Sequence, residues 1–155
     1  MSQVCIGYFE IKKSSIKEKI ALDLRNIARE NGIGIFLNDD VHFEEVLKVA
    51  RKKTNYVIFS ITNTFEYDTC SRIVLPDLCR EGEHSTYLKD DLCKIKKLID
   101  CMLEHSNKIQ FFLGNWNCFE CEYTQHYMNI ANFVEFMCYT INNEFEPLVS
   151  ISIVK

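Results

Sequence analysis

The chain has 155 residues, 26% of them charged, and a formal net charge of −4 at pH 7. This length is typical of one domain that buries its own core without disulfides or metals, so we expect residues 1–155 to form a single domain. Only two prolines and five glycines are present, which excludes a linker or low-complexity chain. No apolar run is long enough to span a membrane, and the acidic balance argues against nucleic acid as a partner.

The first half of the sequence alternates strand-like and helix-like segments. Residues 4–11 are β-branched and aromatic, which predicts a strand. Ser15-Ile-Lys-Glu18 has the pattern of a capping box and starts a helix with apolar residues at helical spacing through Ile27. Asn31-Gly32 is expected to end that helix. We expect a buried strand at 33–37, a helix with its apolar face within 43–50, and a third strand at 56–61.

The second half begins with the least regular stretch, residues 62–87, in which we expect one extra strand at 72–75. A helix then starts near Ser85-Thr86 and keeps helical spacing of apolar residues as far as Met102. Residues 108–113 are expected to form a fourth strand.

The C-terminal part predicts one more helix and one more strand. Over 125–143, a stripe from Tyr127 to Ile141 is apolar, while Phe133 lies off that stripe. A helix that is apolar on more than one side is central to the fold or part of an oligomer interface. Residues 148–154 alternate valine or isoleucine with serine, which predicts a strand with one wetted face near a sheet edge.

The resulting order, β-α-β-α-β-loop-α-β-α-β, predicts the α/β class. Strands separated by helices are usually joined by parallel crossovers, with the helices packed on the sheet. We expect a single mixed, mostly parallel sheet of about five strands with about four helices packed on it. The turn Lys12-Lys13-Ser14-Ser15 lacks the glycines that a phosphate loop requires, which argues against nucleotide binding.

Eight cysteines are present. The N-terminus has neither a basic region nor a long apolar run, so we expect no signal peptide and a cytoplasmic protein with reduced thiols. Cys118-Phe-Glu-Cys121 has the C-x-x-C spacing that supports redox chemistry or supplies two zinc ligands. No second such pair completes a zinc site. A thiol redox or metal-binding protein using Cys118 and Cys121 therefore remains the alternative, and otherwise no cofactor or metal is expected.

The residues that usually carry catalysis form no recognisable arrangement. The four histidines have none of the spacings of zinc enzymes. His105 lies near the end of a predicted helix, where the helix dipole favours a positive charge, and this is a structural reason for its presence. No nucleophile–base pair fits a known catalytic arrangement. We therefore expect a binding protein rather than an enzyme.

Acidic residues are concentrated in two stretches. Residues 63–91 hold seven Asp and Glu against three Lys and Arg, and residues 109–155 hold five against one. In the second stretch the acids alternate with aromatic residues, and an acidic rim around aromatic anchors suits a basic protein partner. The alternative is a solvated loop with core aromatics. The candidate partner-binding residues are Glu66, Asp68, Asp77, Glu81, Glu83, Trp116, Phe119, Glu120, Glu122 and Tyr123.

A small acidic α/β domain with these stretches, and without a catalytic motif, resembles bacterial immunity proteins such as those of contact-dependent growth inhibition systems. The resemblance is one of size, acidity and absent catalytic motif, so no family residues carry over. It implies a cytoplasmic antitoxin that binds a basic toxin domain, for example a nuclease, and occludes its active site. A further alternative is a homo-oligomeric subunit that uses the two-sided helix at 125–143 as its interface.

Overall fold

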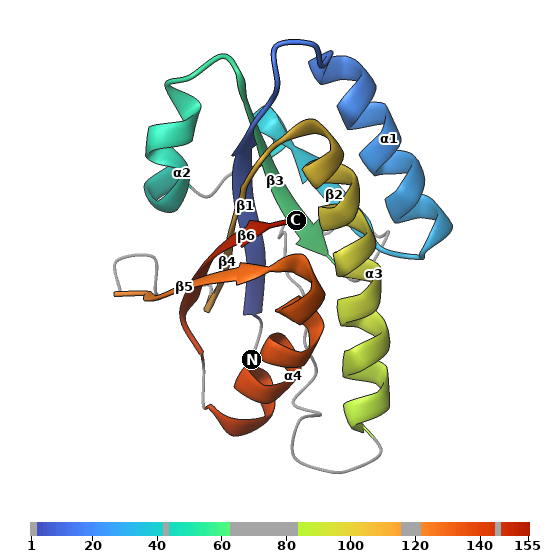
Figure 1. Cartoon of the computed structure of the whole chain (residues 1–155), viewed down its shortest axis with the longest axis vertical. Coiled ribbons are helices and arrows are strands. Elements are labelled where there is room, and N and C mark those ends of the chain that lie inside the picture. The colour runs from blue at the N-terminus through green and yellow to red at the C-terminus, as the bar shows by residue number, and fades with distance from the viewer. Residues whose placement is uncertain (1–2, 42–43, 63–83, 116–121, 145–146) are drawn as a thin grey trace.

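The computed structural model describes residues 3–41, 44–62, 84–115, 122–144 and 147–155 (Figure 1). Their strands form one six-stranded sheet in the order β2-β3-β1-β4-β6-β5. The strands are β1 (Gln3–Glu10), β2 (Gly34–Leu37), β3 (Tyr56–Thr62), β4 (Ile109–Asn115), β5 (Thr124–Asn129) and β6 (Val149–Val154). The helices are α1 (Lys17–Glu30), α2 (Glu44–Arg51), α3 (His84–His105) and α4 (Phe133–Asn143), with short 3₁₀ turns at Asn38–Asp40 and Ile130–Asn132.

The pairing of the strands confirms the α/β class and corrects the expected sheet. Of the five strand pairings among the described residues, only β5 with β6 is parallel, so the expectation of a mostly parallel sheet is wrong. Helices α1, α3 and α4 do join strands of the same direction. In the first two of these units, however, a third strand lies antiparallel between the joined strands. A helical crossover dictates the direction of the strands that it joins, and not their adjacency.

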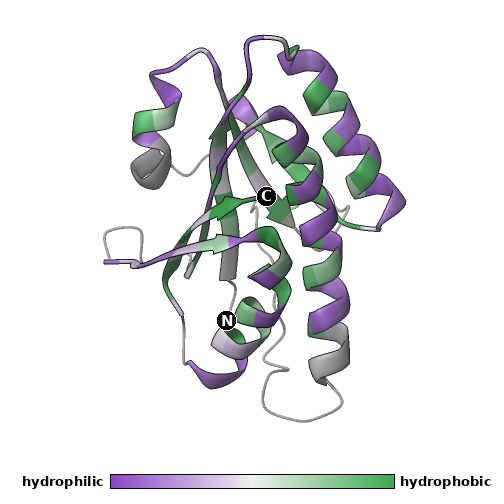
Figure 2. Ribbon diagram, in the orientation of Figure 1, coloured by the Kyte–Doolittle hydropathy of each residue, from purple (hydrophilic) through white to green (hydrophobic). Residues whose placement is uncertain are grey.

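Helices α1, α3 and α4 cover one face of the sheet, while α2 lies on the other face (Figure 1). The main core is on the three-helix side, where Phe9, Phe59 and Phe111 of the central strands are fully buried. Phe133 of α4 meets Phe111 edge-on, with ring centroids 5.3 Å apart. Figure 2 shows the corresponding pattern, with largely hydrophobic central strands and helices that mix hydrophobic and hydrophilic residues. The amphipathic helices thus bury their apolar residues against the sheet.

The connection from β1 to α1 differs from the predicted capping box. Helix α1 has Ile16 at its N-cap position and no side-chain capping hydrogen bond, so the prediction of Ser15 as the cap is wrong. The Ser15 hydroxyl instead lies 3.3 Å from Nδ1 of His105. The predicted stop is confirmed, because Asn31 is the C-cap and Gly32 follows with a positive φ of 69°.

The C-terminal part corrects the predicted helix over 125–143. Only its second part is helical, as α4, while its first part is the strand β5. Exposed and partly buried residues alternate along most of β5, which is the strand period. Tyr127, expected on the buried stripe, is 71% exposed, whereas Phe133, expected off that stripe, is fully buried. The use of α4 as an oligomer interface stays a prediction.

Strand β6 lies next to the edge strand β5, in agreement with the position expected near a sheet edge. The expectation that its serine face contacts water is wrong at Ser150, which is only 1% exposed. The Gln110 side chain donates from Nε2 to the Ser150 hydroxyl at 2.6 Å. The Ser152 hydroxyl donates in turn to Oε1 of Gln110 at 2.9 Å. These three residues form a hydrogen-bonded polar row across β4 and β6.

The face that carries α2 has a small apolar cluster formed by Ile6, Val41, Ala50 and Ile58. The expected strand at 72–75 lies outside the described residues. Within the described ranges, no helix combines the length and the apolar character that crossing a membrane requires.

Ser60 and Ser150 are equally buried serines that offer a matched stability test. The Ser60 hydroxyl has no hydrogen-bond partner among the described residues, whereas the Ser150 hydroxyl bonds to Gln110. We expect Ser60→Ala to raise the free energy of unfolding by about 1 kcal/mol, because it removes an unsatisfied buried hydroxyl. Ser150→Ala should lower that free energy by about 1 kcal/mol. Urea unfolding measures both, and equal losses in the two variants would contradict this account of Ser60.

Candidate functional site

Most residues that the sequence predicted to bind a partner lie outside the described residues. Glu122 and Tyr123 are the two that the structure describes, and they directly precede β5. Glu122 is exposed, while the partly buried Tyr123 packs edge-on against Phe112 with ring centroids 5.6 Å apart. The predicted residues outside the described ranges are Glu66, Asp68, Asp77, Glu81, Glu83, Trp116, Phe119 and Glu120. The alternative pair, Cys118 and Cys121, also lies outside those ranges.

Strand β5, which follows Tyr123, forms one edge of the sheet and pairs with β6 on one side. Thr124, Gln125 and Asn129 are exposed, and Tyr127 projects from the strand with 71% of its surface accessible. The main chain on the outer side of an edge strand has hydrogen-bonding groups that can pair with an added strand. An exposed tyrosine on such an edge can serve as an anchor for a protein partner.

The charged residues in the stretch of sequence that contains β5 are almost all acidic. Residues 109–154 contain no lysine or arginine. Among the described residues of this stretch, Glu122, Glu135 and Glu144 are all exposed. The formal charges of this stretch are thus negative, whereas Lys89 of the neighbouring α3 brings a positive charge close to Cys138 on α4. The negative charge beside β5 itself comes from Glu122, which can attract basic surfaces.

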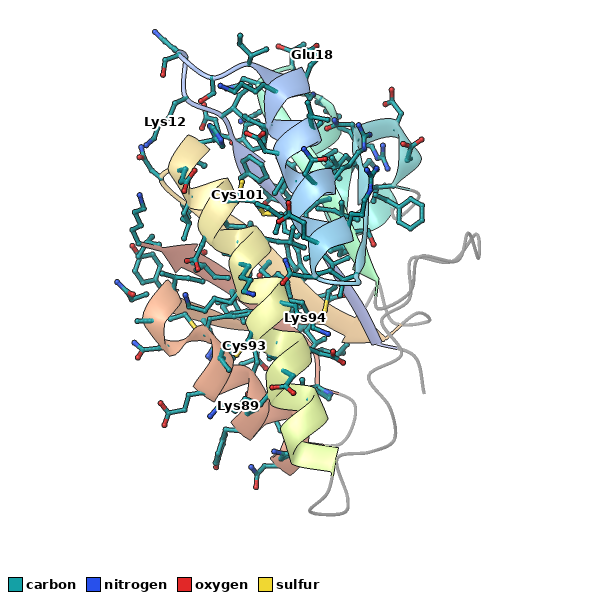
Figure 3. The ribbon with its side chains drawn as sticks, turned by 90° about the vertical axis from the view of Figure 1, so that its right-hand side faces the viewer. Lys12, Glu18, Lys89, Cys93, Lys94 and Cys101 are labelled. Carbon is teal, nitrogen blue, oxygen red and sulfur yellow. The ribbon has the colours of Figure 1, made fainter. Side chains whose placement is uncertain are left out.

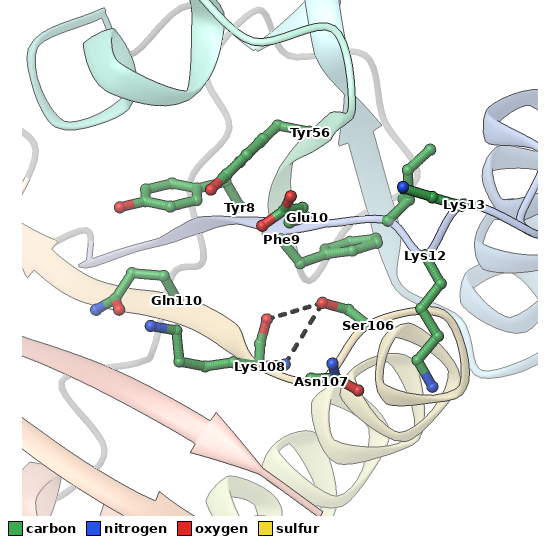
Figure 4. Close-up of a pocket in the computed structure, with 11 residues that line it drawn as sticks. Tyr8, Phe9, Glu10, Lys12, Lys13, Tyr56, Ser106, Asn107, Lys108 and Gln110 are labelled. Carbon is green, nitrogen blue, oxygen red and sulfur yellow. Dashed lines mark hydrogen bonds between the residues drawn. The ribbon is translucent and has the colours of Figure 1, made fainter.

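A hollow of about 550 Å³ lies where β1 ends and β4 begins (Figure 4). This is the end of the central strands that lies away from Glu122 and Tyr123. The tyrosine rings of Tyr8 and Tyr56 line it, with centroids 5.8 Å apart. Lys12, Lys13 and Lys108 also line it, so its charge is opposite to that of the β5 side.

Some polar groups that line this hollow already have hydrogen-bond partners. The Glu10 carboxylate accepts from Nδ2 of Asn55 at 2.7 Å. The Ser106 hydroxyl donates to the carbonyl oxygen of Lys108 at 3.0 Å (Figure 4). The lysines can attract an anion by charge, but none of the described residues that line the hollow has a buried polar atom without a partner.

A third cluster lies at the C-terminal end of α3, beside α1. The Sγ of Cys101, a carboxylate oxygen of Glu104 and a ring nitrogen of His105 lie within 4.8 Å of one another. Cys101 is buried, Glu104 is exposed and His105 is intermediate. Burial raises the pKa of the Cys101 thiol to about 11, and the carboxylates of Glu104 and of Asp23 on α1 add to that rise.

The sequence contained a signal for this cluster that we did not use. Cys101, Glu104 and His105 occupy positions i, i+3 and i+4 of a predicted helix, so they share one face. His105 was explained by the helix dipole alone. Its contact with Ser15 joins residues 90 positions apart and is visible only in the folded chain.

Three of the described thiols have a raised pKa, so they are less acidic than an ordinary cysteine. Burial raises the pKa of Cys5, Cys101 and Cys138 above the ordinary thiol value. A nucleophilic or redox-active cysteine requires a lowered pKa, because the thiolate is the reactive form. The environments of these three residues therefore disfavour thiolate chemistry in the absence of a bound cation.

Neither a protein-family model, nor a curated protein, nor a solved structure matches the chain. Among the described residues, three features bear on function: the edge strand β5, the hollow beside Tyr8 and Tyr56, and the cluster around Cys101.

Proposed function

We propose that this chain is a protein-binding domain that neutralises a basic toxin domain, as an immunity protein does, by covering the toxin's active site. The observation that carries the proposal is the exposed edge strand β5, with Tyr127 71% accessible in a stretch that has no basic residue before Lys155. Glu122 and Tyr123 directly follow, along the chain, the predicted partner-binding residues Trp116, Phe119 and Glu120.

The physical roles of these groups differ. Exposed carboxylates such as Glu122 raise the rate of association with a basic surface by long-range attraction. A tyrosine that becomes buried in the partner provides much of the affinity, because it has large area and few rotatable bonds. The outer edge of β5 adds main-chain hydrogen bonds if the partner contributes a strand.

Complementary charge would place this chain over the toxin's active site. A toxin that cuts nucleic acid needs a positively charged substrate groove. The acidic edge of this chain, at Glu122 and β5, is complementary to such a groove. A domain that binds there excludes the nucleic acid without any catalytic group of its own.

The test is a binding measurement with a basic toxin domain encoded beside the gene for this chain. We expect Tyr127→Ala to weaken the affinity by about 30-fold, equivalent to about 2 kcal/mol, because it removes an interface anchor. Glu122→Lys should mainly slow association, and the slowing should diminish at high salt. Surface plasmon resonance at two salt concentrations separates these effects.

The matched control is Tyr139→Ala. Tyr139 is 67% exposed, similar to Tyr127, but lies on α4 rather than on the sheet edge. We expect its replacement to leave the affinity unchanged. Affinity of the unmodified chain weaker than about 1 μM, or equal losses for the two tyrosine variants, would contradict the proposal.

A further inference from the structure

The helix α3 carries three metal-ligand residue types on one face of its last turns. Cys101, Glu104 and His105 offer a sulfur, an oxygen and a nitrogen, all within 4.8 Å of one another. Ligands of a tetrahedral zinc ion lie roughly 3.5 Å apart, since each bond is about 2.0–2.3 Å long. The three atoms thus lie at or slightly beyond the spacing of zinc ligands.

Two residues from other elements act on this cluster. Ser15, in the turn before α1, places its hydroxyl 3.3 Å from Nδ1 of His105. A hydrogen bond to one ring nitrogen orients a histidine so that the other nitrogen can bind a metal. Asp23 of α1 is close enough for its charge to act on Cys101.

The position of the cluster suits a site that joins two elements. Helices α1 and α3 lie side by side, with Cys101 on the upper turns of α3 next to α1 (Figure 3). The end of α3 is also tied to the β1–α1 turn, because the backbone N–H of Lys12 donates to the carbonyl oxygen of His105 at 2.9 Å. The backbone around the three residues is thus held in place before any ligand binds.

The geometry points to a zinc site formed by Cys101 Sγ, a carboxylate oxygen of Glu104 and Nε2 of His105, which Ser15 orients. Sulfur and imidazole ligands together with a carboxylate are the set that zinc accepts, whereas calcium and magnesium prefer oxygen alone. The fourth position belongs to water. A divalent cation also offsets the negative charges of Glu104 and Asp23, which both act on the Cys101 thiol.

The test uses Co²⁺ as a spectroscopic probe and Zn²⁺ as its competitor, with the full reduced chain. Because Cys118 and Cys121 have a metal-binding spacing of their own, the variants are made both in the unmodified chain and in C118S/C121S. We expect C118S/C121S to bind one equivalent of Co²⁺ with thiolate-to-metal absorption. Added Zn²⁺ should displace the Co²⁺ and should raise the thermal unfolding midpoint.

The ligand variants give graded expectations. Cys101→Ser should abolish the thiolate absorption, and His105→Ala should weaken Zn²⁺ binding by about 100-fold or more, as loss of a ligand exceeds loss of an orienting group. Glu104→Gln and Ser15→Ala should each weaken it by about tenfold. Cys93→Ser is the matched control, because Cys93 is an exposed thiol two turns earlier on the same helix.

Glu104→Gln and Ser15→Ala keep the test decisive if the buried Cys101→Ser variant fails to fold, since Glu104 is exposed. Loss of Zn²⁺ affinity in both of them, with Cys93→Ser unchanged, supports the site. The proposal is overturned if C118S/C121S binds Zn²⁺ no tighter than about 10 μM, or if Cys101→Ser retains the thiolate absorption.

Discussion

Replacing Phe111 by alanine is expected to lower the free energy of unfolding by about 4 kcal/mol, because truncation of a fully buried phenylalanine leaves a cavity. Phe111 is completely inaccessible in the central strand β4 and meets Phe133 edge-on at 5.3 Å. Small domains are stable by only about 5–15 kcal/mol, so the loss is a large fraction of the total. Urea unfolding under reducing conditions, followed by circular dichroism, measures it.

The control for Phe111 is Tyr139→Ala, in which an aromatic side chain that is 67% exposed is truncated. Its effect should remain within about 0.5 kcal/mol. A loss below about 1 kcal/mol for Phe111→Ala would mean that this ring is not enclosed between β4 and α4 as described.

Gly7→Ala is expected to lower the free energy of unfolding by about 3 kcal/mol through overpacking. Gly7 lies in β1 between β3 and β4. An added Cβ would collide with the backbone carbonyl oxygen of Gln110 and come within 2.5 Å of the Phe59 ring. Neither neighbour can move freely, because one is sheet backbone and the other is a fully buried side chain.

Gly32→Ala is the matched control for Gly7, because it separates backbone conformation from close packing. Gly32 has a φ of 69° but no atom within 4 Å of the position that a Cβ would occupy. Its replacement should cost only about 1 kcal/mol, the cost of a left-handed residue. If Gly7→Ala lowered the free energy of unfolding by no more than Gly32→Ala, then β4 and Phe59 would not approach Gly7 as closely as described. Thermal and urea unfolding of both variants distinguish the two results.

The candidate site could be predicted only in part. Glu122 and Tyr123 were singled out from acidic and aromatic composition, and they lead into the exposed edge strand. The exposure of Tyr127 on an edge strand was not predicted, because its segment also fits a helical period. A six-residue strand has too few alternations to outweigh the helical stripe that continues into α4.

The Cys101 cluster shows a different limit. Its three members share a local helical spacing, so their proximity was available from the sequence. Ser15 and Asp23 were not predictable as neighbours, because packing of α1 on α3 and the turn after β1 bring them there. The same serine fitted a capping box, and the folded chain uses its hydroxyl for His105 instead.

The sequence by itself determined the order of most helices and strands and the α/β class. These depend on local propensity and on periodicity within one segment. Only the tertiary structure decided that β1 lies between β3 and β4, that β5 forms an edge, and which residues meet at the end of α3. Strand adjacency depends on hydrogen bonds and packing between segments far apart in the chain, and no local pattern encodes which segments pair.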